Sequence, residues 1–280
     1  MKTLSQAAWN GGPGSIRRGA GWVRGTGCVL ALVGGILCSR LEAAPMALTG
    51  PAAEWVRKGD LLDEKLRTRE SLAAYEEADR QQPGNAEILR RIAREHCLAM
   101  VDTDSKKEKQ ACAEKGLEFA KRAVAADPGN AMAHLALAVC YGRVAPYCDG
   151  KTKIAYSRLI KEETDKSIAI DPGNDYAYHL LGAWDYELAG LNPVLRALAK
   201  VVYGELPAAS YEKSAEYFER AAKMAPDRLA HHVQLGRTYL AQGRRKEALA
   251  SLERGLALPD REKDDPYTRQ LGVEALKKLK

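Results

Sequence analysis

The side chains of this chain that could do chemistry include five histidines and six cysteines, and their spacing matches no common catalytic pattern. No histidine stands in the H-E-x-x-H frame, in which two imidazoles on one helix face bind zinc. The P-loop pattern and the nucleophile elbow G-x-S-x-G do not occur either. Many carboxylates stand near Lys or Arg at helical spacing, which is typical of a solvated surface. We therefore expect no catalytic residue, no metal site, no cofactor and no enzymatic activity.

Four cysteines lie beyond the first 44 residues, namely Cys97, Cys112, Cys140 and Cys148. Each pair flanks the turn of one expected helical hairpin, where antiparallel helices bring the two positions together. We predict disulfides between Cys97 and Cys112 and between Cys140 and Cys148, each closing a hairpin in an oxidising compartment. The alternatives are the other connectivities that four cysteines allow, and four buried free thiols. The chain contains no C-x-x-C pair, which argues against zinc or thioredoxin-like chemistry.

Residues 1–44 predict a targeting leader. Five basic residues precede the first acidic residue, Glu42, and a short apolar core is followed by the small residues Ala43 and Ala44. That order is typical of a secretory signal, with cleavage after Ala43 or Ala44. We expect an exported protein, periplasmic or secreted; an organelle transit peptide and an uncleaved membrane anchor are the alternatives.

Composition narrows the function classes further. Of the 280 residues, 46% are hydrophobic and 29% are charged, which describes a globular chain. The longest apolar run, residues 27–38, is shorter than the about 20 residues that span a bilayer, so a polytopic membrane protein is excluded. Without residues 1–43 the chain holds 38 basic and 36 acidic residues, and its formal charge falls from +6 to +2. Nucleic-acid binding is therefore not expected.

An internal repeat in the sequence predicts the helices that position these side chains. Pro-Gly-Asn recurs at residues 83–85, 128–130 and 172–174, and Pro226 begins a fourth, degenerate copy. Proline cannot donate the hydrogen bond that a helix interior needs, so each copy separates two helices. A small residue stands five positions before each proline, as expected where two helices cross closely. The proline spacings of 45, 44 and 54 residues exceed a 34-residue period by an insert that we place between the two helices of each repeat.

This pattern resembles the tetratricopeptide repeat, whose motif is W-x2-L-G-x2-Y, A-x3-F and P. The resemblance implies an all-α fold over residues 45–280: a right-handed α-solenoid of about five tetratricopeptide hairpins with an elongated fourth repeat. We expect residues 101–110 to form a charged loop and residues 188–207 to form a longer helix or a flap. The first copy consists of Trp55, Gly59, Leu62, Ser71, Tyr75, Ala78 and Pro83, and the last copy runs from Leu235 to Asp260.

In tetratricopeptide proteins, ligands lie against fixed positions of each first helix, which form a concave groove. Val56 and Asp60 are wrong for the carboxylate clamp of chaperone-binding members, so that clamp is absent from the first repeat. His179 is expected to be a packed or hydrogen-bonded residue of the groove and not a metal ligand. Transferred to this sequence, the candidate groove residues are Arg90, Arg94, Leu135, Val139, Tyr176, His179, Tyr186, Val233 and Arg237.

From about residue 131 onward the chain resembles the regulator of microtubule dynamics family more closely. The resemblance is carried by residues 180–184 (LLGAW), 186–189 (YELA), 206–211 (LP followed by SY) and 256–260 (LALPD). It implies an α-helical adaptor domain with microtubule association, organelle contact and lipid binding across the family. A secretory leader would remove the chain from a tubulin-containing cytosol, so microtubules are expected as partners only in a eukaryotic cytosolic setting.

Two functions follow as hypotheses. The first is an adaptor that binds a peptide or partner helix in its concave groove, with apolar anchors supplying affinity and arginines orienting carbonyls or carboxylates. The second is a carrier for an acyl chain, with residues 188–207 closing over the groove. The first predicts a protein partner and the second a lipid.

Overall fold

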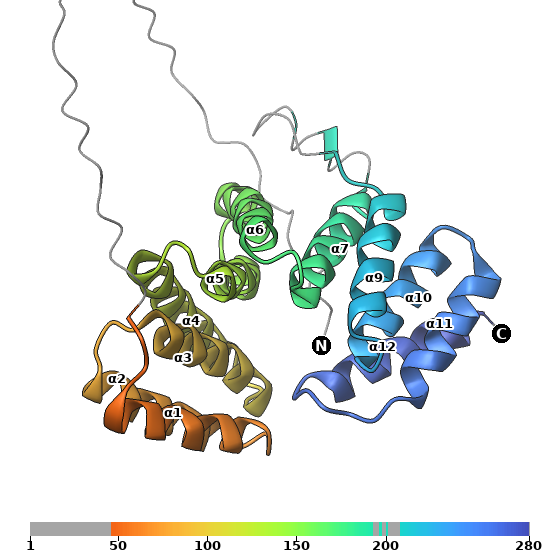
Figure 1. The fold of residues 1–280 in the computed structure, drawn as a ribbon. Helices are drawn as coiled ribbons and strands as arrows, with labels where there is room; N and C mark the ends of the chain where they lie inside the picture. Colours follow the sequence, from red (N-terminus) through yellow and green to blue (C-terminus); the bar gives the residue numbers. More distant parts are fainter. Residues whose placement is uncertain (1–45, 193–195, 198–199, 201–207, 280) are drawn as a thin grey trace, which may run out of the picture.

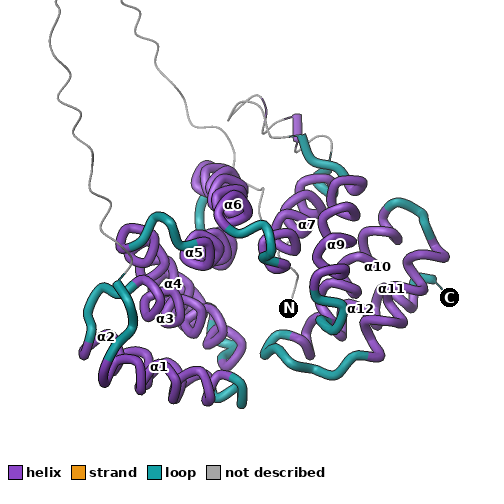
Figure 2. The backbone as a smooth tube through the Cα atoms, in the orientation of Figure 1, coloured by secondary structure: helices purple, strands orange, loops and turns teal. Residues whose placement is uncertain are grey.

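The computed structural model describes residues 46–192, 196–197, 200 and 208–279 of the chain. Within these ranges the chain is helical and has no β-strand, which confirms the all-α solenoid (Figures 1 and 2). The predicted leader, residues 1–44, lies outside them. The helices are α1 (Gly50–Asp63), α2 (Thr68–Gln81), α3 (Ala86–Ala99), α4 (Lys106–Ala126), α5 (Ala131–Val144), α6 (Gly150–Ile170), α7 (Asp175–Ala189), α9 (Tyr211–Met224), α10 (Leu229–Ala241), α11 (Arg245–Ala257) and α12 (Asp265–Lys277), with 3-10 turns η1 (Met100–Asp102) and η2 (Ala145–Tyr147).

Five helical hairpins follow one another along the chain: α1 with α2, α3 with α4, α5 with α6, α7 with α9, and α10 with α11. The first helices of neighbouring repeats also contact each other, α3 with α5, α5 with α7 and α7 with α10. The first helices therefore lie on the inside of the curve that Figure 1 shows, and we call this curved row the arch. Their inward side is the inner wall.

The Pro-Gly-Asn turns end one repeat and begin the next. In each of the three copies the asparagine is the N-cap of the following helix: Asn85 Oδ1 accepts a hydrogen bond from the Glu87 amide, Asn130 from Ala133 and Asn174 from Ala177. Gly84 has a φ of +76°, a conformation that costs glycine little. The same three residues thus stop one helix and start another.

In the first, fourth and fifth hairpins, a large side chain of the second helix packs onto a glycine of the first: Tyr75 on Gly59, Phe218 on Gly182 and Leu252 on Gly236. A Cβ added to Gly59 would lie 2.3 Å from the Tyr75 ring, and one added to Gly236 would lie 2.6 Å from Leu252 Cγ. Tyr75 and Leu252 are almost wholly buried. The small residues found in the sequence are therefore the points at which the helices approach, and the ring or isobutyl group fills the gap beside them.

Two features of the elements differ from expectation. The predicted loop at 101–110 is mostly the 3-10 turn η1 and the first turns of α4, because α4 absorbs the insert by growing to 21 residues. A further helix, α12, follows the fifth hairpin and packs against α10 and α11. The insert at 188–207 lies largely outside the described residues, including every residue whose helical spacing suggested a flap.

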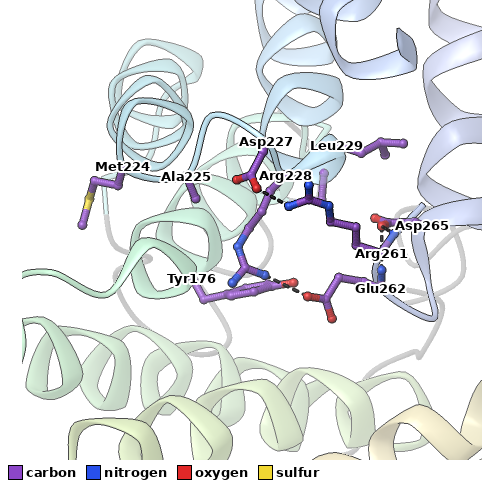
Figure 3. Close-up of a pocket in the computed structure, with 10 residues that line it drawn as sticks. Tyr176, Met224, Ala225, Asp227, Arg228, Leu229, Arg261, Glu262 and Asp265 are labelled. Atoms are coloured by element: carbon purple, nitrogen blue, oxygen red, sulfur yellow. Dashed lines mark hydrogen bonds and ion pairs between the residues drawn. The ribbon is translucent and has the colours of Figure 1, made fainter. Parts of the chain in front are cut away.

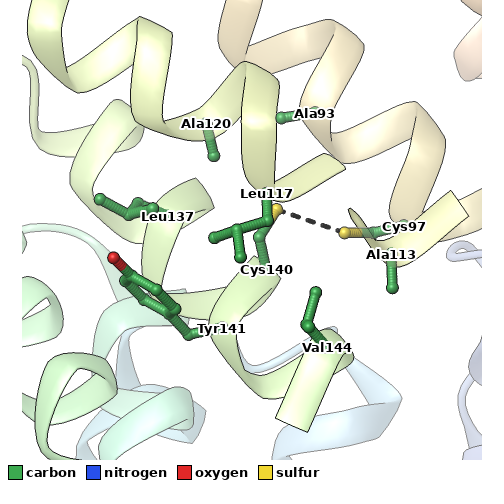
Figure 4. Close-up of a cluster of buried hydrophobic side chains, with 9 residues drawn as sticks. All are labelled: Ala93, Cys97, Ala113, Leu117, Ala120, Leu137, Cys140, Tyr141 and Val144. Carbon is green, nitrogen blue, oxygen red and sulfur yellow. Dashed lines mark hydrogen bonds between the residues drawn. The ribbon is translucent and has the colours of Figure 1, made fainter. Parts of the chain in front are cut away.

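The predicted disulfides are wrong, because all four cysteines beyond the leader are free. Cys97 Sγ lies 3.4 Å from Cys140 Sγ, and both side chains are buried in the cluster that Figure 4 shows. The two cysteines belong to α3 and α5, the first helices of neighbouring repeats. Gly116 of α4 leaves the space in which the sulfurs meet, since a Cβ there would lie 3.3 Å from Cys97 Sγ and 3.5 Å from Cys140 Sγ. Contact between repeats, and not closure of a hairpin, decides which thiols are neighbours.

In the part of the chain that the structure describes, no helix is both long enough and apolar enough to serve as a membrane span.

Candidate binding surface on the inner wall

The predicted groove residues differ from one another in their burial and in their contacts. Val139, Tyr176, Tyr186 and Arg237 are half-buried, and the Arg237 guanidinium lies over the Tyr186 ring, 5.1 Å from its centroid. Leu135 is 5% exposed and belongs to the interior more than to the surface.

Val233 is not available to a ligand, because its side chain is 0% exposed. It packs with Leu229, Leu252 and Ala275, and the last of these lies on α12. The sequence reasoning missed α12, which covers the position that a ligand would otherwise contact in the fifth repeat. Val233 is therefore a core residue.

Arg90 and Arg94 are held by carboxylates of the chain itself. Arg90 forms an ion pair with Glu87 on the same helix. Arg94 Nη1 lies 2.6 Å from Asp63 Oδ2 and 3.0 Å from Glu95 Oε1, so one guanidinium joins α1 to α3. Burial acts against the charge of Arg94, but these carboxylates raise its pKa above the ordinary value. The arginine is thus charged, and carboxylates of the chain itself fix its orientation.

A pocket of about 260 Å³ opens beside Tyr176, between α7 and the turn that precedes α10 (Figure 3). Arg228 crosses this pocket with its guanidinium 4.4 Å from the centroid of the Tyr176 ring. Its Nε lies 2.9 Å from Asp175 Oδ2, and its Nη1 lies 2.9 Å from Glu262 Oε1. Arg228 is thus a cation held over an aromatic ring and between two carboxylates of the chain itself.

Glu262 belongs to the segment between α11 and α12, residues 258–264, which we call the closing loop. Its other carboxylate oxygen, Oε2, lies 3.3 Å from Nη2 of Arg94. Arg94 of α3 and Arg228 of the turn before α10 therefore hold one carboxylate between them, one arginine on each oxygen.

Two further ion pairs join the closing loop to the early repeats, and we call all of these contacts together the junction. Lys263 Nζ lies 2.6 Å from Asp102 Oδ2 and donates a hydrogen bond to the Thr68 hydroxyl. Arg143 Nη2 on α5 lies 3.3 Å from Asp264 Oδ2. The closing loop thus touches the first three repeats, although it follows the fifth in sequence, and in Figure 1 it lies at the open side of the arch, with its tip toward the early helices.

His179 lies beside the pocket in a chain of polar groups. Its Nδ1 is 2.9 Å from Nδ1 of His231, whose Nε2 is 2.8 Å from Asp175 Oδ2. Burial lowers the pKa of His179 to about 3, which keeps its ring neutral. Burial would raise the pKa of Asp175, but the hydrogen bond from His231 and the charge of Arg228 lower it below its usual value. The arrangement orients the Asp175 carboxylate toward Arg228.

No set of three or more candidate metal-ligating side chains gathers among the described residues. The histidine pair with Asp175 is a hydrogen-bonded chain, in which each interaction joins two protein groups. Its evident role is positional, because it fixes the carboxylate that holds Arg228 over Tyr176.

The sequence reasoning missed Arg228, although the repeat contained a signal for it. In three copies of the turn motif the N-cap is asparagine, and in the fourth the same position holds Arg228, which makes no side-chain cap. Arginine has donors only and cannot accept the amide hydrogen bonds of a helix start. Because the Arg228 side chain does not cap the helix, it is able to make another contact.

Comparisons with known proteins identify relatives in sequence and in structure. The family model described as Regulator of microtubule dynamics protein 1-3 matches residues 55–280. A protein named Regulator of microtubule dynamics protein 1 from Pongo abelii is 31% identical over 243 residues, which is 85% of this chain and 75% of the relative. The Bos taurus protein of the same name is 32% identical over 232 residues, which is 81% of this chain and 71% of the relative.

Among solved structures, a thermophilic TPR protein from Thermus thermophilus matches with a TM-score of 0.57 at 19% identity. The match covers 80% of this chain and 98% of that chain. At this identity the likeness shows the fold alone, and it agrees with the solenoid of helical hairpins described above.

Proposed function

Because the chain belongs to the regulator of microtubule dynamics family, we propose that it is a non-enzymatic adaptor that holds an extended segment of a partner protein against its inner wall. Its predicted resemblance to this family is confirmed. The observation that carries the proposal is that Glu262 lies between Arg94 and Arg228, each of which forms an ion pair with one oxygen of its carboxylate. These arginines thus already bind the carboxylate of a protein side chain.

The inner wall also has the side chains that such a segment needs. Tyr176 and Tyr186 are half-buried, each with an arginine over its ring. Aromatic side chains with fixed arginines beside them are typical of surfaces that bind proteins, because they bury a large area at a small entropic cost. His179 hydrogen-bonds to His231, and His231 hydrogen-bonds to Asp175, which holds Arg228, so these polar groups serve to position the arginine.

Site-specific photo-crosslinking tests the adaptor function. A benzoylphenylalanine at Tyr186 should give an adduct with one defined protein, and mass spectrometry should map it to a single short segment of that protein. The same probe at the exposed Glu118 of α4 is the matched control and should give no such adduct. A synthetic peptide of the mapped segment should then bind the purified chain. Equal adducts from both positions, or a mapped peptide that does not bind, would contradict the proposal.

The compartment decides which partners the adaptor meets. Export after cleavage of residues 1–44 is part of the proposal, and N-terminal sequencing of the purified protein checks it. Microtubules enter as partners only if the chain resides in a eukaryotic cytosol, where co-sedimentation with polymerised tubulin is the test. The relatives are named as regulators of microtubule dynamics, and we propose a microtubule role for this chain only under that condition.

The alternative of an acyl-chain carrier draws no support from the inner-wall pocket. Carboxylates and guanidiniums line much of it, and its volume of about 260 Å³ falls short of ~300–1,000 Å³, the range typical of ligand pockets. The remaining part of that alternative rests on residues 188–207, which lie largely outside the described ranges.

A further inference from the structure

The closing loop contacts the inner wall in the way that a bound peptide would. Glu262 sits between two arginines, Lys263 faces Asp102, and Asp264 faces Arg143. Together, these three consecutive loop residues contact the first, second, third and fifth repeats, as a segment bound across a solenoid would. Glu262 lies 168 residues from Arg94 in the sequence, so the arch has to curve from the second repeat to the fifth to bring them together.

Polar groups carry the contact between the closing loop and the first three repeats. Among the described residues, the hydrophobic clusters do not place a side chain of residues 259–264 together with one of α1 to α5. The paired side chains range from 12% exposed for Lys263 to 41% exposed for Asp264, so solvent reaches all of these ion pairs. Ion pairs that solvent reaches stabilise a contact modestly. The loop is thus held by interactions that a competing carboxylate is able to replace.

We propose that the closing loop is an internal stand-in for the partner, and that the partner segment is an extended acidic peptide with two carboxylates two residues apart. It would seat one carboxylate between Arg94 and Arg228 and the other on Arg143, after displacing Glu262 and Asp264. This inference rests on the proposed adaptor function, and it names both the partner class and the element that regulates access.

When the closing loop leaves the inner wall, the arginines that it contacted favour binding of an acidic ligand. Asp264 is the carboxylate with which Arg143 forms an ion pair, so that arginine loses its ion-pair partner. Arg94 keeps Asp63 and Glu95, and Arg228 keeps Asp175, which hold both guanidiniums in place. Fixed guanidiniums bind a carboxylate with little further loss of entropy. These arginines supply the carboxylate recognition that Val56 and Asp60 of the first repeat cannot.

A titration with defined peptides tests the proposal on the full chain. The probe is fluorescein-labelled hexaglutamate, followed by anisotropy, and labelled hexaglutamine is the neutral control. The double variant Glu262→Gln, Asp264→Asn removes the two loop carboxylates. Neither side chain caps α12, so the helix is expected to persist. If the loop blocks the site in nine molecules out of ten, this variant should bind hexaglutamate about tenfold more tightly than the parent chain.

Two further variants make the test specific. Glu253→Gln with Glu274→Gln removes two exposed carboxylates from α11 and α12, and should leave the affinity unchanged. Adding Arg94→Gln and Arg143→Gln to the opened variant should abolish the gain, while circular dichroism verifies that it is folded. An opened variant that binds hexaglutamate no better than the parent, or that binds hexaglutamine equally well, overturns the inference.

The outcomes separate this inference from the adaptor function. If hexaglutamate fails to bind the opened variant, but the peptide mapped by crosslinking at Tyr186 binds, the acidic partner is wrong and the adaptor stands. If both peptides fail, both proposals fall.

Discussion

At the scale of single residues, glycine marks where helices of one hairpin touch. Gly236→Ala would set a methyl group 2.6 Å from Leu252 Cγ and 3.0 Å from the Leu252 backbone nitrogen. Because backbone cannot rotate away, we expect a loss of about 1–3 kcal/mol in the free energy of unfolding, measured by urea denaturation.

Gly142→Ala is the matched control, since its methyl group would meet only Ile160 Cδ1, at 3.8 Å. Alanine is the better helix former, so this change should stabilise the chain by about 0.5–1 kcal/mol. Equal effects at the two positions would contradict the close approach at Gly236.

Glu95 makes stability depend on pH near neutrality. Its carboxyl group is 1% exposed and accepts hydrogen bonds from Ser71 and Arg94. Burial raises its pKa to about 7, while the Ser71 hydroxyl acts in the opposite direction. Because the folded-state pKa lies above the unfolded value, the favourable contribution is complete below pH 4.5 and is lost as the pH rises through about 7.

Glu95→Gln should remove that pH dependence, because the amide resembles the protonated acid. We expect the variant to gain about 1–3 kcal/mol over the parent chain on going from pH 5 to pH 8, measured by urea unfolding at each pH. The exposed Glu274→Gln should show no such trend. A constant difference between parent and Glu95→Gln across this range would refute the raised pKa.

At the scale of elements, the asparagine caps start the repeats. Asn130→Ala leaves the Ala133 amide without its acceptor and also removes the hydrogen bond from Asn130 Nδ2 to Glu87 Oε1. We expect a loss of about 1 kcal/mol in the free energy of unfolding. Asn130→Ser keeps an oxygen for the amide and should recover most of it. If the serine variant were as unstable as the alanine variant, capping would not be the cause.

The hairpins were predictable because local rules set them. A proline cannot continue a helix, an asparagine caps the next one, and a small residue permits a crossing, so Pro128, Asn130 and Ala123 predict a boundary by themselves. Helix α12 begins with Asp265-Pro266, a start signal that lies outside the Pro-Gly-Asn series, and was missed. Its burial of Val233 then removed a predicted ligand contact, which shows that a wall position depends on what the next element covers.

The site was less predictable than the fold, for a geometric reason. Tyr176 and Arg94 were predicted as groove residues, and both do lie at the junction with the closing loop. Their partner Glu262 was not, because the contact depends on curvature summed over all the repeats. Each repeat contributes a small rotation that no local pattern encodes.

At the scale of the whole molecule, the arch should open in salt. Raising NaCl from about 0.1 M to about 1 M shortens the Debye length from ~10 Å to ~3 Å and weakens exposed ion pairs. Small-angle X-ray scattering should therefore show a larger radius of gyration at high salt. The Glu262→Gln, Asp264→Asn variant should already be expanded at low salt and respond little.

The charge-matched Glu253→Gln, Glu274→Gln variant should follow the parent curve, because it removes the same charge away from the junction. A radius of gyration that does not change with salt in the parent chain would mean that the closing loop is held by more than its ion pairs.

The contact between Lys263 and Asp102 also changes how the molecule should come apart. In a linear stack, the first and last hairpins each contact a single neighbouring hairpin, so unfolding starts at these hairpins and proceeds inward. Here Lys263, which follows the fifth hairpin, reaches back to Thr68 of the first and Asp102 after α3, so polar contacts close the described hairpins into a ring. Fraying of either terminus then requires breaking two boundaries instead of one, and the row of modest hairpins should melt as a single cooperative unit.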